Sequence, residues 1–250
     1  MGVRAVRDSG ERGRGVRRHV RSVFWGAVAV GVVTVLAGLV LSLPVETRQG
    51  VDYVVETKQI PLLLKIVDFY NRHLHYKALV QEIVAGAERE EDKVLALFRW
   101  VHRTIHAGTP PGLRVIDDHP WNIIVRGYGE PDQISDVFVT LCSYVGVPAY
   151  FYMVQAESTG ATFSFSVVSI NGKWRLLDPY FGVIFRNRDG ELATLEEART
   201  DPVVLEMVRP QPIFNGTPYA DLVRSERVVL VSERGRYQSP WARLMYALGW

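Results

Sequence analysis

The chain has 250 residues, a net charge of +2 and a single cysteine, Cys142. One cysteine excludes an intramolecular disulfide. Residues 1–22 hold seven arginines against Asp8 and Glu11, a net charge of +5, which leaves −3 for the remainder of the chain. Because the basic charge is confined to this tail, the composition does not indicate a nucleic-acid-binding protein, and we expect no nucleic acid among the partners.

An uncharged apolar run from Val23 to Leu43 follows the arginine-rich tail. As a helix, its 21 residues would extend about 30 Å, which is the thickness of a bilayer core. A cleaved signal peptide is the main alternative, but its apolar region usually has only about 7–15 residues. The sequence Ser42-Leu43-Pro44 is also a poor cleavage site. We therefore predict a single-pass transmembrane helix over residues 23–43.

The position of the arginines predicts the orientation of this span. Loops on the cytoplasmic side of a membrane are enriched in Lys and Arg. Residues 1–22 are therefore expected to form a cytoplasmic tail, and the chain is expected to lie in the inner (cytoplasmic) membrane with its C-terminal domain outside. The membrane is thus the first predicted partner. The outer part has about 200 residues, which is enough for one domain with its own core.

Periodicity predicts the first elements of the outer part. Residues 51–58 are typical of a short extended segment, and residues 62–83 repeat apolar side chains at helical spacing. A second helix is predicted over 92–105, with Val94, Leu97, Phe98, Val101 and Ile105 on one face. Residues 113–129 are predicted to form a loop that ends at Gly127-Tyr128-Gly129.

The clearest helix is predicted to begin at Pro131 and to run to about Val145, because proline suits a first helical turn and apolar residues recur along the segment. Strands are predicted over 149–154, 162–170 and 174–178, and the last two are joined by Asn171-Gly172, a strong hairpin signal. Residues 209–219 are predicted to be irregular, and 227–232 to form a last strand. Helices followed by an antiparallel sheet indicate an α+β domain.

Two segments carry a resemblance to a known family. The stretch GYGEPDQISDVFVTLCSYVGVPA, from Gly127 to Ala149, resembles the nucleophile helix of transglutaminase-like proteins, in which Gly-x-x-Cys-Asp precedes a helix and Gly-Ile/Val-Pro-Ala follows it. The stretch FSFSVVSINGKWRLLDPYFG resembles the second family block, which runs from a histidine through a Gly-Lys-Trp turn to Leu-Asp-Pro. The resemblance implies a papain-like, transglutaminase-like fold.

The charge pattern, the apolar run and the resemblance together predict a division of the chain into five parts. The tail is expected over residues 1–22 and the transmembrane helix over 23–43. A linker and helical segment is expected over 44–90, the transglutaminase-like core over 91–185, and a C-terminal extension over 186–250.

The departures from the family pattern concern its catalytic residues. The family cysteine falls at Pro131, and its histidine falls at Phe163, or at Ser164 if the hairpin register shifts by one. Only the third member of the triad, Asp178, is retained. A proline offers no nucleophile and a phenylalanine no proton, so the resemblance implies a degenerate member without catalytic residues. Cys142 lies about three helical turns beyond Pro131 on the apolar face, where it is expected to be a buried hydrophobic residue.

Histidines give only a weak metal signal. His102 and His106 are spaced as two ligands on one helix face, and His119 lies beside Asp117 and Asp118. The glutamate of the zinc motif HExxH is replaced by Arg103. We therefore expect no metal site and no cofactor.

Aromatic side chains are the remaining candidates for a binding site. An aromatic groove is suited to a peptide or a glycan, whereas the same rings could instead fill the core where polar catalytic groups were lost. Asp178 either caps the turn before Pro179 or contacts a ligand. The candidate binding residues are Trp121, Tyr128, Tyr150, Tyr152, Phe163 and Asp178. The aromatic segment 237–250 is predicted to be a short amphipathic helix that contacts the membrane, a partner or its own domain.

Together these observations favour a catalytically inactive, membrane-anchored transglutaminase-like domain that acts as a binding or scaffolding protein in the cell envelope, with a protein partner in an envelope complex. The alternative is an extracytoplasmic hydrolase or acyl-transfer enzyme that uses a non-standard set of residues in the same cleft. His102, His106, His119 and Asp117 are the candidates for such a set.

Overall fold

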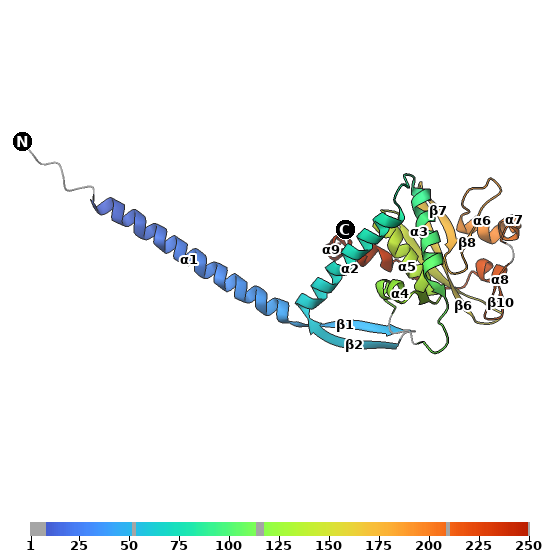
Figure 1. Cartoon of the computed structure of the whole chain (residues 1–250), viewed down its shortest axis with the longest axis horizontal. Helices are drawn as coiled ribbons and strands as arrows, with labels where there is room; N and C mark the ends of the chain where they lie inside the picture. The colour runs from blue at the N-terminus through green and yellow to red at the C-terminus, as the bar shows by residue number, and fades with distance from the viewer. Residues whose placement is uncertain (1–8, 52–53, 114–117, 209–210, 250) are drawn as a thin grey trace, which may run out of the picture. The chain divides into compact units, whose positions relative to one another are not determined.

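The computed structural model describes residues 9–51, 54–113, 118–208 and 211–249 (Figure 1). The chain divides into two compact units, residues 1–47 with 58–67 and residues 48–57 with 68–250, and each is described by itself. The predicted fold class, α+β, is confirmed: an apolar N-terminal helix is present, and the larger unit combines helices with an antiparallel sheet.

The smaller unit contains the apolar helix. Within α1 (Ser9–Ser42), the stretch Val23–Ser42 is long and apolar enough to cross a membrane and is not buried in the protein. A signal sequence near an N-terminus has the same properties. The side chains of the arginine-rich tail lie outside the described part of the chain. After α1, β1 (Pro44–Val51) and β2 (Val54–Pro61) form a two-stranded sheet, of which we had predicted only an extended segment at 51–58.

Two long helices and a short one precede the central helix. The predicted helix at 62–83 is confirmed as α2 (Leu62–Ile83), and the next predicted helix is α3 (Glu90–Thr104). The predicted loop at 113–129 is wrong, because it contains α4 (Pro120–Arg126) and β4 (Tyr128–Gly129), which pairs in parallel with β3 (His106–Ala107). The ring Nδ1 of His119 caps α4 and Gly127 ends it at φ 73°, so local signals, rather than periodicity, define this helix.

The central helix, α5 (Pro131–Tyr144), has the predicted start and ends one residue before the predicted end. Its first turn is held by a capping box, in which Glu130 accepts from the backbone of Gln133 and the Gln133 side chain accepts from Glu130 N. Nearly every side chain of α5 is buried, including Cys142, as predicted from its apolar face. A helix that is buried on nearly all sides lies in the centre of its domain.

A five-stranded antiparallel sheet packs against α5 in the order β11-β5-β6-β7-β8. The predicted strands appear as β5 (Ala149–Gln155), β6 (Thr162–Ile170), β7 (Lys173–Asp178) and β11 (Val228–Ser232), and β8 (Val183–Ile184) is added at one edge. The turn at Asn171-Gly172 has φ of 51° and 75°, the left-handed conformation that a two-residue type I′ turn needs.

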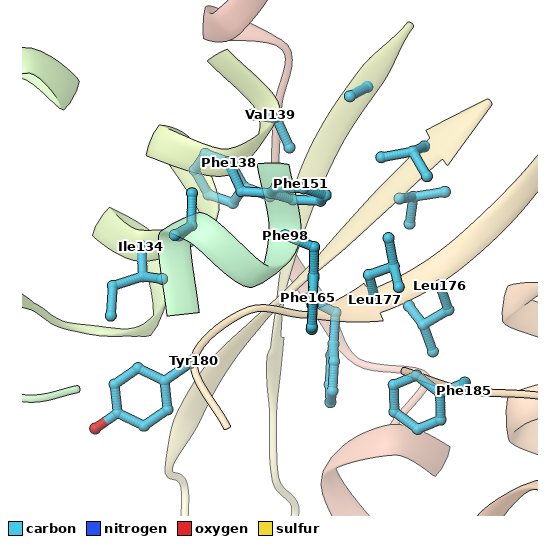
Figure 2. Close-up of a cluster of buried hydrophobic side chains, with 14 of the residues drawn as sticks. Phe98, Ile134, Phe138, Val139, Phe151, Phe165, Leu176, Leu177, Tyr180 and Phe185 are labelled. Atoms are coloured by element: carbon cyan, nitrogen blue, oxygen red, sulfur yellow. The ribbon is translucent and has the colours of Figure 1, made fainter. Parts of the chain in front are cut away.

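The core lies between this sheet and the helices (Figure 2). Phe98 of α3 meets Phe138 of α5 edge to face at 5.8 Å between ring centroids, and both are almost fully buried. On the sheet side, Phe165 of β6 lies 6.4 Å from Phe185. Burial of each such ring stabilises the fold by roughly 1.5–3 kcal/mol.

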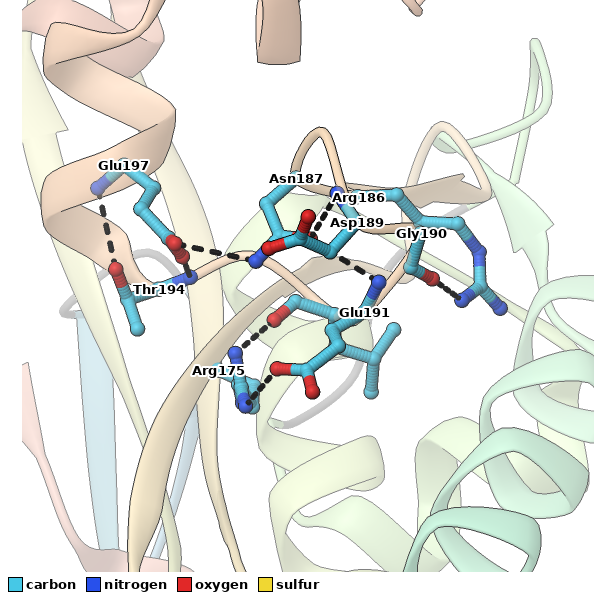
Figure 3. Close-up of polar contacts among 9 residues, drawn as sticks. Arg175, Arg186, Asn187, Asp189, Gly190, Glu191, Thr194 and Glu197 are labelled. Carbon is cyan, nitrogen blue, oxygen red and sulfur yellow. Dashed lines mark hydrogen bonds and ion pairs between the residues drawn. The ribbon is translucent and has the colours of Figure 1, made fainter.

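The segment after β8 is fixed by polar contacts (Figure 3). Arg175 of β7 donates to Leu192 O and, at 3.1 Å, to Glu191 Oε2. The side chain of Asn187 accepts from the backbone N–H groups of Asp189 and Glu191 and donates to Glu197. These bonds fix the turn at residues 187–191 against β7. The chain then continues into α6 (Leu195–Thr200) and α7 (Pro202–Glu206).

The C-terminal residues complete the sheet and cover α5. The predicted irregular segment contains a small hairpin of β9 (Ile213–Phe214) and β10 (Thr217–Pro218) and leads into α8 (Tyr219–Arg224), whereas residues 209–210 lie outside the description. After β11, the 3₁₀ helix η1 (Arg234–Gln238) crosses α5. Gly235 lies so close that a Cβ there would stand 2.9 Å from Thr140 N. The predicted amphipathic helix is α9 (Pro240–Ala247).

Candidate functional site

Asp178, which we predicted to be the retained triad member, ends β7 and is fully buried. Its Oδ1 accepts from the backbone N–H groups of Tyr180 at 2.9 Å and Phe181 at 3.1 Å, and its Oδ2 accepts from the hydroxyl of Tyr219 at 2.6 Å. Burial raises the pKa of Asp178 to about 7, although these three donors oppose the shift. The carboxyl therefore caps the turn after β7, as one of our two interpretations held, and its third donor comes from α8.

Phe163, which we predicted to occupy the position of the family histidine, is 1% exposed on β6. It stacks parallel to Phe181, with ring centroids 5.4 Å apart, and meets Tyr180, Phe214 and Tyr219 at steep angles. The space around Phe163 is thus filled with aromatic rings. His102 contacts the turn that follows Asp178, where it bonds to Pro179 O.

Pro131 begins α5 and is buried. The preceding Glu130 accepts from both the backbone N–H and the hydroxyl of Thr109, at 3.1 and 2.9 Å. The Glu130 carboxylate is close enough to Tyr180 to contribute to the raised pKa of that phenol, after burial. Since the Tyr180 ring also meets Phe163 at 5.8 Å, Tyr180 links the start of α5 with the aromatic cluster around Asp178.

The helix start at Pro131, the strand with Phe163 and the buried Asp178 follow the order of the family's two blocks. A family model described as the transglutaminase-like superfamily matches residues 77–179. This part of the chain is a transglutaminase-like domain. No curated protein sequence matches the chain.

Three solved structures are similar to part of this chain. A candidate cysteine protease from Cytophaga hutchinsonii is 17% identical, with a TM-score of 0.39 over 51% of this chain and 45% of that one. A candidate protease from Parabacteroides distasonis is 13% identical (TM-score 0.35; 54% and 36% covered), and a TGase is 13% identical (TM-score 0.36; 63% and 49% covered). The chain spans less than half of the length of each of these proteins.

The environment of Cys142 disfavours a nucleophilic role for this residue. Its side chain is fully buried, and burial alone raises the pKa of its thiol far above the usual range. A thiol acts as a nucleophile through its thiolate, which this environment disfavours.

The histidines have separate structural contacts. His102 donates from Nδ1 to Pro179 O at 3.2 Å, His119 caps α4, and His106 lies on β3. Among the described residues no three His, Cys, Asp or Glu side chains are placed to hold a metal ion. Asp117, the fourth member of the alternative set, lies outside the described part of the chain.

The aromatic candidates do not line one groove. Phe163 and Tyr152 are buried in the core, and Tyr152 lies under the Arg199 guanidinium at 5.8 Å. The other three have contacts of their own: Trp121 stacks on His75, Tyr128 lies under Arg126, and Tyr150 meets Trp174 beside a cavity of about 420 Å³.

Sequence reasoning missed two polar residues of the domain. The role of Tyr219 is not predictable from the sequence, because its hydrogen bond to Asp178 joins residues 41 positions apart and no local sequence pattern indicates such a pair. Asp136 belongs to the stretch that resembles the family helix, yet it is buried on α5 beside a cavity lined by other charged side chains. A carboxylate directly before the apolar residues 137–139 is the signal that could have identified it.

Proposed function

We propose that the protein is a catalytically inactive transglutaminase-like domain that binds or scaffolds other proteins in the cell envelope. One observation supports this proposal: Phe163, which we assign to the position of the family histidine, is buried and contacts Phe181, Tyr180 and other aromatic rings. A cysteine–histidine pair needs both the thiolate and a base that can carry its proton, and neither side chain is offered by Pro131 and Phe163.

The apolar helix supports an anchored location for this function. Val23–Ser42 is long enough to cross a bilayer, and the basic residues that precede it favour a cytoplasmic N-terminus. We therefore propose the inner membrane as the location and the extracytoplasmic side as the site of the domain.

Turnover assays test the inactivity. The full chain in detergent is incubated with an amine donor and a glutamine-rich acceptor protein, and separately with a fluorogenic peptide. We expect no product above that of the Cys142→Ala variant or buffer. Product formation that is lost in a His102→Ala variant would replace the proposal with the alternative enzyme.

Binding is tested in parallel by crosslinking the tagged full chain in native membranes and identifying the recovered proteins. We expect a defined envelope partner in amounts comparable to the bait. Recovery of the bait and lipid alone would contradict a scaffolding role.

A further inference from the structure

A second cavity lies between α5, Asp118 and the segment that joins β11 to η1. Its lining shares no residue with the aromatic cluster around Phe163. The cavity measures about 400 Å³. Four acidic side chains line it, Asp118, Asp132, Asp136 and Glu233, against one basic residue, Arg234. Apolar and aromatic walls come from Phe151, Leu230, Val231 and Tyr237. An acidic cavity with aromatic walls is suited to an organic cation.

Asp136 is the residue that points to a ligand. Its side chain is 7% exposed, it lines the cavity, and its Oδ1 has no hydrogen-bond partner in the described part of the chain. Burial raises the pKa of Asp136 to about 7, and the attraction of Arg234 only partly opposes this. Buried carboxylate oxygens are nearly always hydrogen-bonded, because leaving one unpaired is costly. A positively charged group in the cavity would stabilise this buried carboxylate electrostatically.

The cavity opens beside the edge of the sheet. Among the described strands β11 pairs with β5 alone, and its residues Val228, Val229, Leu230 and Val231 are 37–57% exposed. An edge strand of this kind presents unpaired backbone groups to which an extended peptide can add. A bulge interrupts the strand between Val228 and Leu230, which leaves Leu230 to Ser232, the part that lines the cavity, in regular register.

We propose that this surface binds an extended segment of a protein partner, which pairs with β11 and places an arginine or lysine side chain in the cavity beside Asp136. This inference rests on the proposed binding function and specifies its partner. A metal ion is a poor fit, because no three of these carboxylates are placed around a common point in the described structure. An anionic partner is disfavoured by the acidic lining.

The test uses a labelled peptide, acetyl-Thr-Val-Arg-Val-Thr-amide, and its citrulline counterpart, which keeps the shape of arginine but is neutral. Binding to the full chain in detergent is followed by fluorescence anisotropy. We expect the arginine peptide to bind at least about tenfold more tightly, the usual scale for a charge-assisted hydrogen bond. Asp136→Asn should remove this difference and leave the citrulline peptide unchanged.

Two further variants keep the test decisive if Asp136→Asn folds poorly. Arg234→Gln removes the competing cation at an exposed position and should tighten binding of the arginine peptide. Glu196→Gln, on the exposed side of α6, is the matched control and should change nothing.

Equal affinity for the two peptides, or weaker binding in Arg234→Gln, would overturn the inference. Agmatine competing as well as the peptide would indicate a small-amine site instead, and concentration-dependent dimers that block the peptide would assign the edge to a second copy. A membrane partner that is recovered equally with Asp136→Asn would refute this site and leave the proposed function standing. Catalytic turnover in the assays above would refute the proposed function, independently of the result of the peptide-binding assay.

Discussion

The variant Asp178→Asn tests which of two opposing effects determines the pKa of the buried carboxyl at the end of β7. Desolvation favours the neutral acid, whereas the hydrogen bonds from Tyr180, Phe181 and Tyr219 favour the carboxylate. The folded-state pKa is raised from 3.8 to about 7, so the folded protein holds a proton that the unfolded chain releases. The free energy of unfolding should therefore decrease as pH rises between about 4 and 7.

The magnitude follows from the size of the shift. Each pKa unit corresponds to about 1.4 kcal/mol, so between pH 5 and pH 8 Asp178 should remove about 2–3 kcal/mol from the stability of the wild type. The amide of the Asp178→Asn variant cannot ionise, so this variant should lack that part of the decrease. Asp136, whose pKa is also raised to about 7, titrates in both proteins and cancels from the comparison.

The assay is urea unfolding of the full chain in detergent, followed by tryptophan fluorescence at pH 5 and pH 8. Tyr219→Phe serves as a control with an opposite sign, because loss of its hydrogen bond should raise the pKa of Asp178 further and steepen the pH dependence. If the wild type and Asp178→Asn lose the same stability between the two pH values, the three donors outweigh desolvation and the reasoning fails.

Three other predictions concern packing and topology. Gly182→Ala should destabilise the fold by roughly 1–3 kcal/mol more than Gly190→Ala. Both glycines have a positive φ, but only a Cβ at position 182 would meet the His102 ring, at 2.5 Å. Equal unfolding midpoints of the two variants would contradict this prediction. Cys142 should react with thiol reagents only after denaturation, and Cys142→Ala should cost about 1–2 kcal/mol; rapid native labelling would refute its burial. A reporter fused after residue 250 should be active outside the cytoplasm and resist carbonate extraction, and release of a mature form starting near residue 44 would indicate a signal peptide instead.

The sequence predicts those elements whose signals are local and repeated. The helix from Pro131 and the strands around Asn171-Gly172 were predicted because periodicity and turn chemistry agree there. The helix at Pro120 was missed because seven residues are too few to establish a period, and its definition depends on the cap at His119.

The site was predicted only in part, for a related reason. The positions of Pro131, Phe163 and Asp178 follow from the family pattern, but what surrounds them does not. The bond from Tyr219 and the stacking of Phe181 on Phe163 depend on contacts across the fold. The unpartnered oxygen of Asp136 becomes visible only when the neighbouring strand and η1 are in place.

The edge strand β11 comes from the last part of the chain, and this order has a consequence for the folding of the domain during synthesis. Val228 pairs with Val154, and Gly235 then closes against the backbone of α5, so strand β5 remains an open edge until the last part of the chain has been delivered. During synthesis the partly folded domain should therefore expose the apolar strand β5 until this long connection has been produced and closed. Interruption of synthesis before residue 228 should leave a species prone to pair with other chains, and rapid delivery of the C-terminal segment should protect it.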